Sequence, residues 1–149
     1  MLALDQASKS VLIALLEERG FRGVEVTGFL NLVMVWNEGV SFGMLAGGAE
    51  AMRWLLAGLA LAIAAALVVW LARLDARRPA LAVGLIVGGA IGNAADRILR
   101  GAVADFFDLH AGGLHWPAFN VADAAITVGV LLLLADALLT PRRDSKVGS

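Results

Sequence analysis

Long apolar runs, interrupted by charge at only a few points, dominate the chain. Trp54 to Ala72 holds nineteen residues without a charged side chain, bounded by Arg53 and Arg73. At 1.5 Å per residue, that length spans roughly 30 Å of hydrocarbon. Pro79 to Ala95 is a second uncharged run, of seventeen residues, and it opens on a proline suited to a helix start. Both runs predict transmembrane helices.

Two further apolar stretches contain acidic residues. Pro117 to Leu139 is interrupted only by Asp123 near one end and Asp136 near the other, and Leu2 to Leu16 is apolar apart from a few polar positions. The second stretch is short, because about twenty residues are usual for a span, so either the native chain begins earlier or tilt and local thinning of the bilayer complete the crossing. We expect one membrane-embedded domain over residues 1–149, an all-α polytopic membrane protein with four transmembrane helices, at about residues 2–18, 53–73, 79–97 and 117–139.

The connections between these runs predict a small β-sheet. Phe29 to Trp36 is rich in apolar and β-branched residues, as a strand is, while residues 105–110 and 114–119 flank Gly112-Gly113 as the strands of a hairpin do. Residues 37–48 combine turn-forming side chains with glycines, which is typical of a loop that moves. We expect the sheet to lie on the outer membrane surface and this loop to act as a flap.

Composition agrees with a membrane protein, and the basic residues orient it. The chain is 60% hydrophobic and 17% charged, with a mean hydropathy of +0.81, which is too apolar for a small soluble domain. Arginines lie at 73, 77 and 78, between the second and third spans, and basic residues also follow the fourth span. The positive-inside rule therefore predicts cytoplasmic chain ends. A net charge of −1 does not indicate nucleic-acid binding.

Two aspartates with polar neighbours are the candidates for chemistry. Asp105 lies in the predicted hairpin, and Asp123 follows Asn120 at the start of the fourth apolar run. An ionisable group inside a bilayer costs about 2.5 kcal/mol or more near a helix centre, so such a pair indicates a functional site. Asn93 and Arg97, one helical turn apart in the third run, are expected to share a cluster near the same interface. Hydrogen bonding between helices is the plainer interpretation of these groups.

The residue types favour hydrolysis by paired carboxylates. The sequence has no cysteine, no nucleophile-elbow motif and no metal-binding signature, which leaves water activated between an ionised and a protonated aspartate. Asp5 and Lys9, four residues apart, predict an internal ion pair. His110 and His115 are a weaker candidate for zinc, because residues that flank a Gly-Gly hairpin are ordinarily exposed.

Two other classes of protein would also place carboxylates in membrane helices. A small proton-coupled transporter or channel requires a polar track across the whole bilayer. Residues 127–135 are almost wholly apolar, and the polar residues gather near the outer side. A purely structural membrane scaffold is the second alternative, since a motif is a hypothesis until its structural context confirms it.

Five blocks occur in order over nearly the whole chain: Asp5 to Lys9, Asn37 to Phe42, Gly88 to Arg97, Val103 to Phe106 and Phe119 to Asp123. In this order they resemble the motifs of bacterial lipoprotein signal peptidase, also called signal peptidase II. The sequence departs from that family in having few residues before the first block. The resemblance implies a four-helix inner-membrane aspartyl peptidase without a cofactor, which removes signal peptides from prolipoproteins just before a cysteine that carries a diacylglyceryl group.

The family's functional positions transfer to this sequence through those blocks. The resemblance places the two catalytic aspartates at Asp105 and Asp123. It implies supporting or substrate-contacting roles for Asp5, Lys9, Asn37, Gly39, Asn93, Arg97, Asn120 and Ala122. The partners we expect are signal peptides carrying diacylglyceryl-cysteine and membrane lipids, with the enzyme acting as a monomer and its active site near the outer face.

Overall fold

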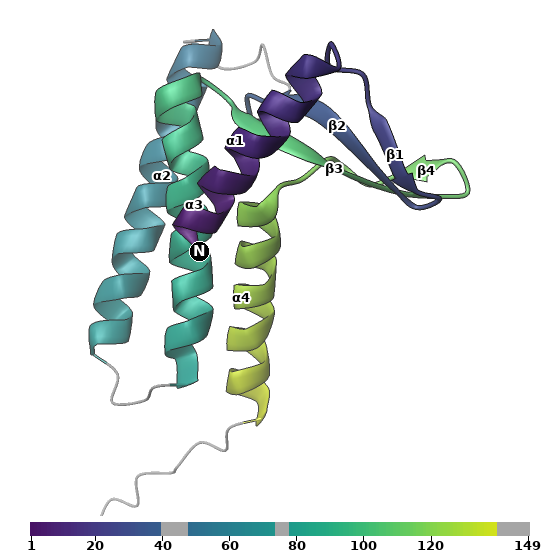
Figure 1. Ribbon diagram of the computed structural model, residues 1–149. Helices are drawn as coiled ribbons and strands as arrows, with labels where there is room; N and C mark the ends of the chain where they lie inside the picture. The colour runs from purple at the N-terminus through teal and green to yellow at the C-terminus, as the bar shows by residue number, and fades with distance from the viewer. Residues whose placement is uncertain (40–47, 74–77, 140–149) are drawn as a thin grey trace, which may run out of the picture.

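Three long helices stand beneath a small antiparallel sheet in the computed structural model, which describes residues 1–39, 48–73 and 78–139 (Figure 1). A shorter helix runs obliquely upward from the middle of the bundle, and its far end lies above the strands in this view (Figure 1). The elements in chain order are α1 (Leu2–Glu18), β1 (Val24–Thr27), β2 (Leu30–Asn37), α2 (Gly48–Ala72), α3 (Arg78–Arg100), β3 (Val103–Ala111), β4 (Leu114–His115) and α4 (Val121–Leu139). Helix α3 lies between α2 and α4 and packs against both (Figure 1).

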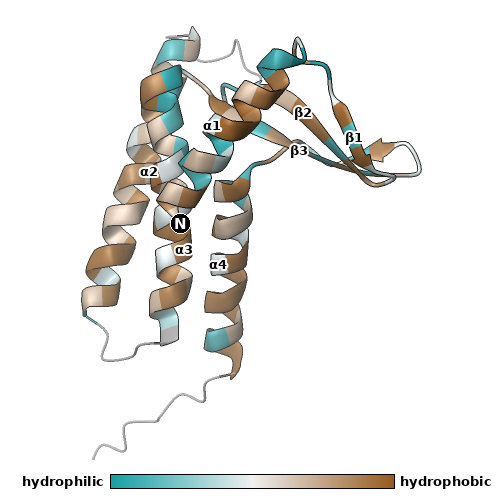
Figure 2. Cartoon of the chain, in the orientation of Figure 1, coloured by the Kyte–Doolittle hydropathy of each residue, from teal (hydrophilic) through white to brown (hydrophobic). Residues whose placement is uncertain are grey.

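Among the described residues, three helices are long and apolar enough to cross a membrane: α2, α3 and α4. Apolar residues cover most of the length of α2 and α4, whereas α3, in the middle, is the most buried of the three (Figure 2). Helix α1 has 17 residues and begins with Met1 against Gly88, near the middle of α3. It also buries two charged residues, Asp5 and Lys9. Three of the four predicted spans thus have the required length and composition, and the crossing by α1 stays a prediction.

The helix of the fourth apolar run begins at Val121 and not at Pro117. The backbone N–H groups of Phe106 and Phe107 both donate to the carbonyl oxygen of Phe119, at 3.1 and 2.9 Å, and the Phe119 N–H donates back to Phe107. This pairing holds the residue in an extended conformation against β3. The chain can enter the helix only after it, which places the polar residue Asn120 at the helix start.

The predicted strand and hairpin are both present. The sheet has the order β1-β2-β3-β4, with all neighbours antiparallel. In the hairpin, His110 pairs with His115 on either side of the glycine turn, although β4 is only two residues long. The first strand, β1, was not predicted from the sequence. The loop expected to act as a flap lies largely outside the described residues, which include only its first three and its last.

Close helix packing brings polar side chains together at the sheet end of the bundle. A Cβ added at Gly92 would overlap the carboxylate of Asp5, and one added at Gly89 would lie 2.6 Å from the carbonyl oxygen of Ala122. Glycine at these two positions therefore lets α1 and α4 approach the same end of α3. Above them, Leu16 and Phe106 are fully buried between α1 and the sheet.

Candidate active site

Asp123 is held at the N-terminus of α4 by reciprocal capping. The Asp123 N–H donates to Asn120 Oδ1 at 3.0 Å, and the Asn120 N–H donates to Asp123 Oδ2 at 3.2 Å. This is the arrangement of a capping box, in which the N-cap residue and the third helical residue satisfy each other's backbone. The second carboxylate oxygen, Oδ1, accepts a hydrogen bond of 2.7 Å from Asn93 Nδ2 on α3. Both oxygens of Asp123 are thus oriented by asparagines.

Asp105, on β3, is buried and is also held by two asparagines. Its Oδ1 accepts from Asn120 Nδ2 at 2.6 Å, and its Oδ2 accepts from Asn37 Nδ2 at 2.9 Å. The other end of the Asn37 amide, Oδ1, accepts the N–H of Gly39 at 2.9 Å. Gly39 has a φ of +100°, and a Cβ there would overlap Leu56. Glycine is therefore required for the turn that orients Asn37.

Asn120 connects the two aspartates. Its Nδ2 donates to Asp105, while its Oδ1 and its own N–H exchange hydrogen bonds with Asp123. Since Oδ1 accepts an N–H, the amide can only point its NH₂ group at Asp105. The structure therefore brings the two predicted aspartates into one hydrogen-bonded cluster, although they lie on different elements.

Burial raises the pKa of Asp105 above its usual range. The hydrogen bond from Asn37 opposes this rise, the negative charge of Asp123 adds to it, and the hydrogen bond from Asn120 opposes it. Asp105 is almost inaccessible to solvent, whereas Asp123 is partly exposed. The negative charge of Asp123 therefore makes ionisation of the buried Asp105 less favourable.

The predicted ion pair between Asp5 and Lys9 is confirmed, and it forms part of a larger buried network. Lys9 Nζ lies 2.9 Å from Asp5 Oδ2, 2.7 Å from Asp96 Oδ2 and 3.0 Å from Asn93 Oδ1, with Lys9 and both carboxylates fully buried. These three acceptors use all three donors of the ammonium group. Because Lys9 donates to Asn93 Oδ1, the NH₂ group of that amide faces Asp123.

Asp5 and Ala122 join α1 to the first turn of α4. The Ala122 N–H donates to Asp5 Oδ1 at 3.0 Å, which gives one of the free N–H groups at the helix start a buried acceptor. Ala122 is fully buried, with its carbonyl group close to Gly89. Ala122 therefore contributes its backbone N–H to the contact between α1 and α4.

Arg97 lies beside this cluster and has no hydrogen bond to either aspartate in the described part of the chain. Its Nη1 donates to the carbonyl oxygen of Asn93 at 3.4 Å, which confirms that the two residues share a cluster. Its Nε is buried and has no hydrogen-bond partner among the described residues. The guanidinium group is positively charged near both carboxylates, and a role in substrate contact stays a prediction.

Sequence reasoning missed Asp96 and Gln6 as members of the site. Asp96 is fully buried and pairs with both Lys9 and Arg100. Gln6 Nε2 donates to Asp5 Oδ2 at 3.1 Å and to Asp96 Oδ1 at 3.2 Å. The sequence signal for Asp96 was its place one turn after Asn93 in an apolar helix, where a buried acid needs a cationic partner.

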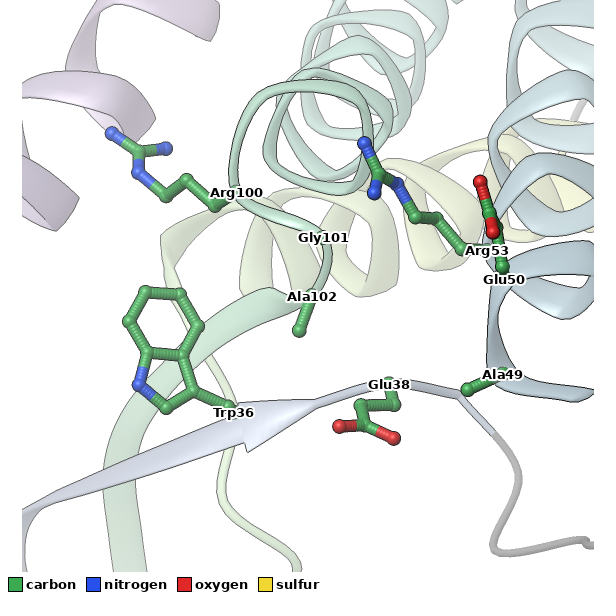
Figure 3. A pocket seen from close by; sticks show the side chains of 8 residues that line it. All are labelled: Trp36, Glu38, Ala49, Glu50, Arg53, Arg100, Gly101 and Ala102. Atoms are coloured by element: carbon green, nitrogen blue, oxygen red, sulfur yellow. The ribbon is translucent and has the colours of Figure 1, made fainter.

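A cleft of about 670 Å³ opens between the end of β2, the start of α2 and the turn from α3 to β3 (Figure 3). Trp36 and Glu38 line it on the β2 side, so they flank Asn37, which holds Asp105. On the α2 side, Arg53 donates to the carbonyl oxygen of Ile98 at 2.8 Å. The cleft therefore provides an open space next to the strand that orients one of the aspartates.

Comparison with known proteins gives a consistent result. The profile of the family described as signal peptidase (SPase) II matches residues 1–139. The chain is 49% identical to a lipoprotein signal peptidase of Methylobacterium sp. (strain 4-46), covering 95% of this chain and 86% of that protein. It is 52% identical to that of Rhizorhabdus wittichii, covering 99% and 85%. A solved structure described as a bacterial membrane enzyme at 2.3 Å resolution superposes with a TM-score of 0.73 and 30% identity, over 99% of this chain and 88% of that one.

Proposed function

Because the chain belongs to the signal peptidase II family, we propose that it is an intramembrane aspartyl endopeptidase in which Asp105 and Asp123 are the catalytic carboxylates. Family membership itself makes it a membrane protease that cleaves lipoprotein signal peptides. The observation that supports the aspartyl mechanism is that one side chain, Asn120, is hydrogen-bonded to both aspartates. A water molecule activated between two carboxyl groups requires that these groups be held in a fixed relation.

In the proposed reaction, the two carboxyl groups carry one proton between them. The ionised group takes a proton from water, and the water oxygen attacks the scissile carbonyl carbon while the protonated group donates to the carbonyl oxygen. The C–N bond then breaks as the amine nitrogen takes a proton from the pair. The asparagines at 37, 93 and 120 keep the carboxylates oriented, because together they donate to all four carboxylate oxygens, two of them through Asn120. The positive charge of Arg97 stabilises the oxyanion.

The substrate we propose is a prolipoprotein cleaved just before its diacylglyceryl-cysteine. The aspartates lie at the sheet end of the three apolar helices, so a bond at the membrane interface is within reach (Figure 1). Acyl chains hold a peptide at that depth, since each buried methylene contributes about 0.8 kcal/mol. The cleft beside Asn37 is the space we assign to the polypeptide chain (Figure 3). We propose residues 37–48, most of which lie outside the described part of the chain, as the flap.

Lipidation of the substrate is expected to control the rate. The purified protein in detergent should cleave a diacylglyceryl-modified precursor at least about 100-fold more efficiently, in kcat/KM, than the same precursor without lipid, because loss of acyl burial removes several kcal/mol of binding. Product sizes measured by mass spectrometry report both the rate and the bond that is cut. A precursor with serine in place of the cysteine is the matched control. Equal kcat/KM for the lipidated and unlipidated forms would contradict this substrate.

We further propose that the protein is a monomer with four spans, with both ends in the cytoplasm of a bacterial cell and the sheet outside the inner membrane. The arginine distribution supports this orientation. The sheet and Asp105 lie at one end of the bundle, and the end of α2 lies at the other (Figure 1). A transporter is less well supported, because the hydrogen-bonded cluster around the aspartates lies only at the sheet end.

The orientation predicts a labelling pattern. The chain has no cysteine, so an impermeant thiol reagent added to intact spheroplasts will report on a single introduced cysteine. Ala49→Cys, at the exposed start of α2, should react, and Ala76→Cys, in the segment outside the described residues, should react only after lysis. Labelling of the second variant from outside, with protection of the first, would reverse the orientation.

A further inference from the structure

Asp96 occupies a position from which it contacts the supports of both aspartates. It is fully buried on α3, and its two carboxylate oxygens have separate sets of partners. Oδ2 lies 2.7 Å from Lys9 Nζ and accepts the N–H of Ala104 at 3.3 Å. Oδ1 pairs with Arg100 and accepts from Gln6 at 3.2 Å. Oδ2 thus contacts residues next to the two aspartates, whereas Oδ1 contacts Arg100 at the C-terminal end of α3.

Oδ2 is connected to Asp123 through Lys9 and Asn93, and to Asp105 through the backbone of Ala104. Lys9, held by Asp96, donates to Asn93 Oδ1 and so orients the NH₂ group that contacts Asp123. Ala104 directly precedes Asp105, so the hydrogen bond to its N–H fixes the start of β3, which carries that carboxylate. Among the described residues, Asp96 has no hydrogen bond or ion pair with either aspartate.

We infer that Asp96 is a positioning residue for the peptidase reaction, one that keeps the two catalytic carboxyl groups in their relative orientation through Lys9 and the backbone of Ala104. The inference rests on the proposed function. It extends that function, because Asp96 lies inside the family block from Gly88 to Arg97 but received no role from the resemblance. Removal of the Asp96 charge should also leave Asp5 as the one anionic partner of Lys9 among the described residues. The surroundings of Asp105 and Asp123 then become more positive.

Asp96→Asn tests this role in the purified full chain, assayed on the diacylglyceryl-modified precursor. The expected result is a fall in kcat of about 100-fold, as a small misplacement of catalytic groups produces, with KM changed by less than about twofold because Asp96 does not touch substrate. The pH profile should also move to lower pH, since added positive charge lowers the pKa values of the pair. A purely structural role would lower the rate without moving the profile.

Asp108→Asn is the matched control, because Asp108 is also a buried aspartate, but its carboxylate contacts Asn31 and His115 and has no described contact with Lys9 or Ala104. It should keep kcat within about threefold, as expected of a contact that does not reach the two catalytic aspartates. If Asp96→Asn does not fold, Asp96→Glu serves in its place: it displaces the carboxylate but keeps the charge, so kcat should fall while KM and the Tm of the protein stay close to the parental values. Parental kcat in either Asp96 variant, an equal loss in Asp108→Asn, or a loss of kcat that only follows a lower Tm would overturn the inference. Failure of the parent protein to cleave the precursor would instead overturn the proposed function.

Discussion

Asp105→Asn and Asp123→Asn are each expected to lower kcat by about 10⁴-fold or more, because an amide can neither take a proton from water nor donate one as a carboxylic acid does. The double variant should be little worse than either single one, since groups that act as a unit are not additive. Cleavage of the lipidated precursor, followed by mass spectrometry, provides the measurement. Both variants should remain folded, because a buried amide costs less than a buried charge.

Asp108→Asn is the matched control for this prediction. Asp108 is also a buried aspartate on β3, but its carboxylate accepts from Asn31 at 3.0 Å and contacts His115 at 2.9 Å, away from the asparagines of the site. It should keep most of the parental kcat. Substantial turnover by well-folded Asp123→Asn would rule out the aspartyl mechanism, and loss of folding in both site variants would favour a structural scaffold.

The same pair sets the pH dependence that we expect for the parental enzyme. Activity requires one ionised and one protonated carboxyl group, so kcat should follow a bell-shaped curve whose limbs belong to the pair. Burial raises the pKa of Asp105. The shared proton is therefore retained above the pH at which an ordinary aspartate loses it. The fall of kcat on the basic side of the curve should accordingly occur at a higher pH.

Lys9→Met is expected to cause the largest loss of stability. Lys9 is fully buried between Asp5 and Asp96, and methionine leaves two buried carboxylates without their shared cation. Removal of one partner from a buried ion pair costs about 3–5 kcal/mol, so the free energy of unfolding should fall by at least that amount. Thermal unfolding of the protein in detergent micelles measures this as a lower Tm. Activity should fall as well, because Asn93 loses the hydrogen bond that orients its amide.

Two comparisons make the Lys9 result specific. Arg22→Met removes a cation from an exposed position, and surface changes of this kind alter stability by about 0.5 kcal/mol or less. Lys9→Met combined with Asp96→Asn should recover part of the lost stability, since only Asp5 then lacks its cation. An unfolding curve of Lys9→Met that overlays the parental one would show that the buried network contributes nothing to the fold.

The sequence by itself determined the features that depend on neighbours along the chain. Uncharged length predicted the helices α2 and α3, because crossing hydrocarbon requires about twenty apolar residues. The glycine pair at 112 and 113 predicted the hairpin, and the four-residue spacing of Asp5 and Lys9 predicted their ion pair. Asp105 and Asp123 were recognised for the same reason, since a few neighbouring residues of the sequence are enough to show an aspartate in an apolar segment.

Only the tertiary structure decided which amide meets which carboxylate. The Ala122 N–H donates to Asp5, 117 residues away in the sequence, and the Asn37 side chain donates to Asp105, 68 residues away. No local period encodes such pairs, because the first depends on how closely glycine lets the helices approach, and the second on the register of β2 against β3. The role of Asp96 was hidden for the same reason. One cationic partner of Asp96, Arg100, lies on its own helix, but the fully buried partner lies on another, and only the packing of α1 against α3 identifies it as Lys9.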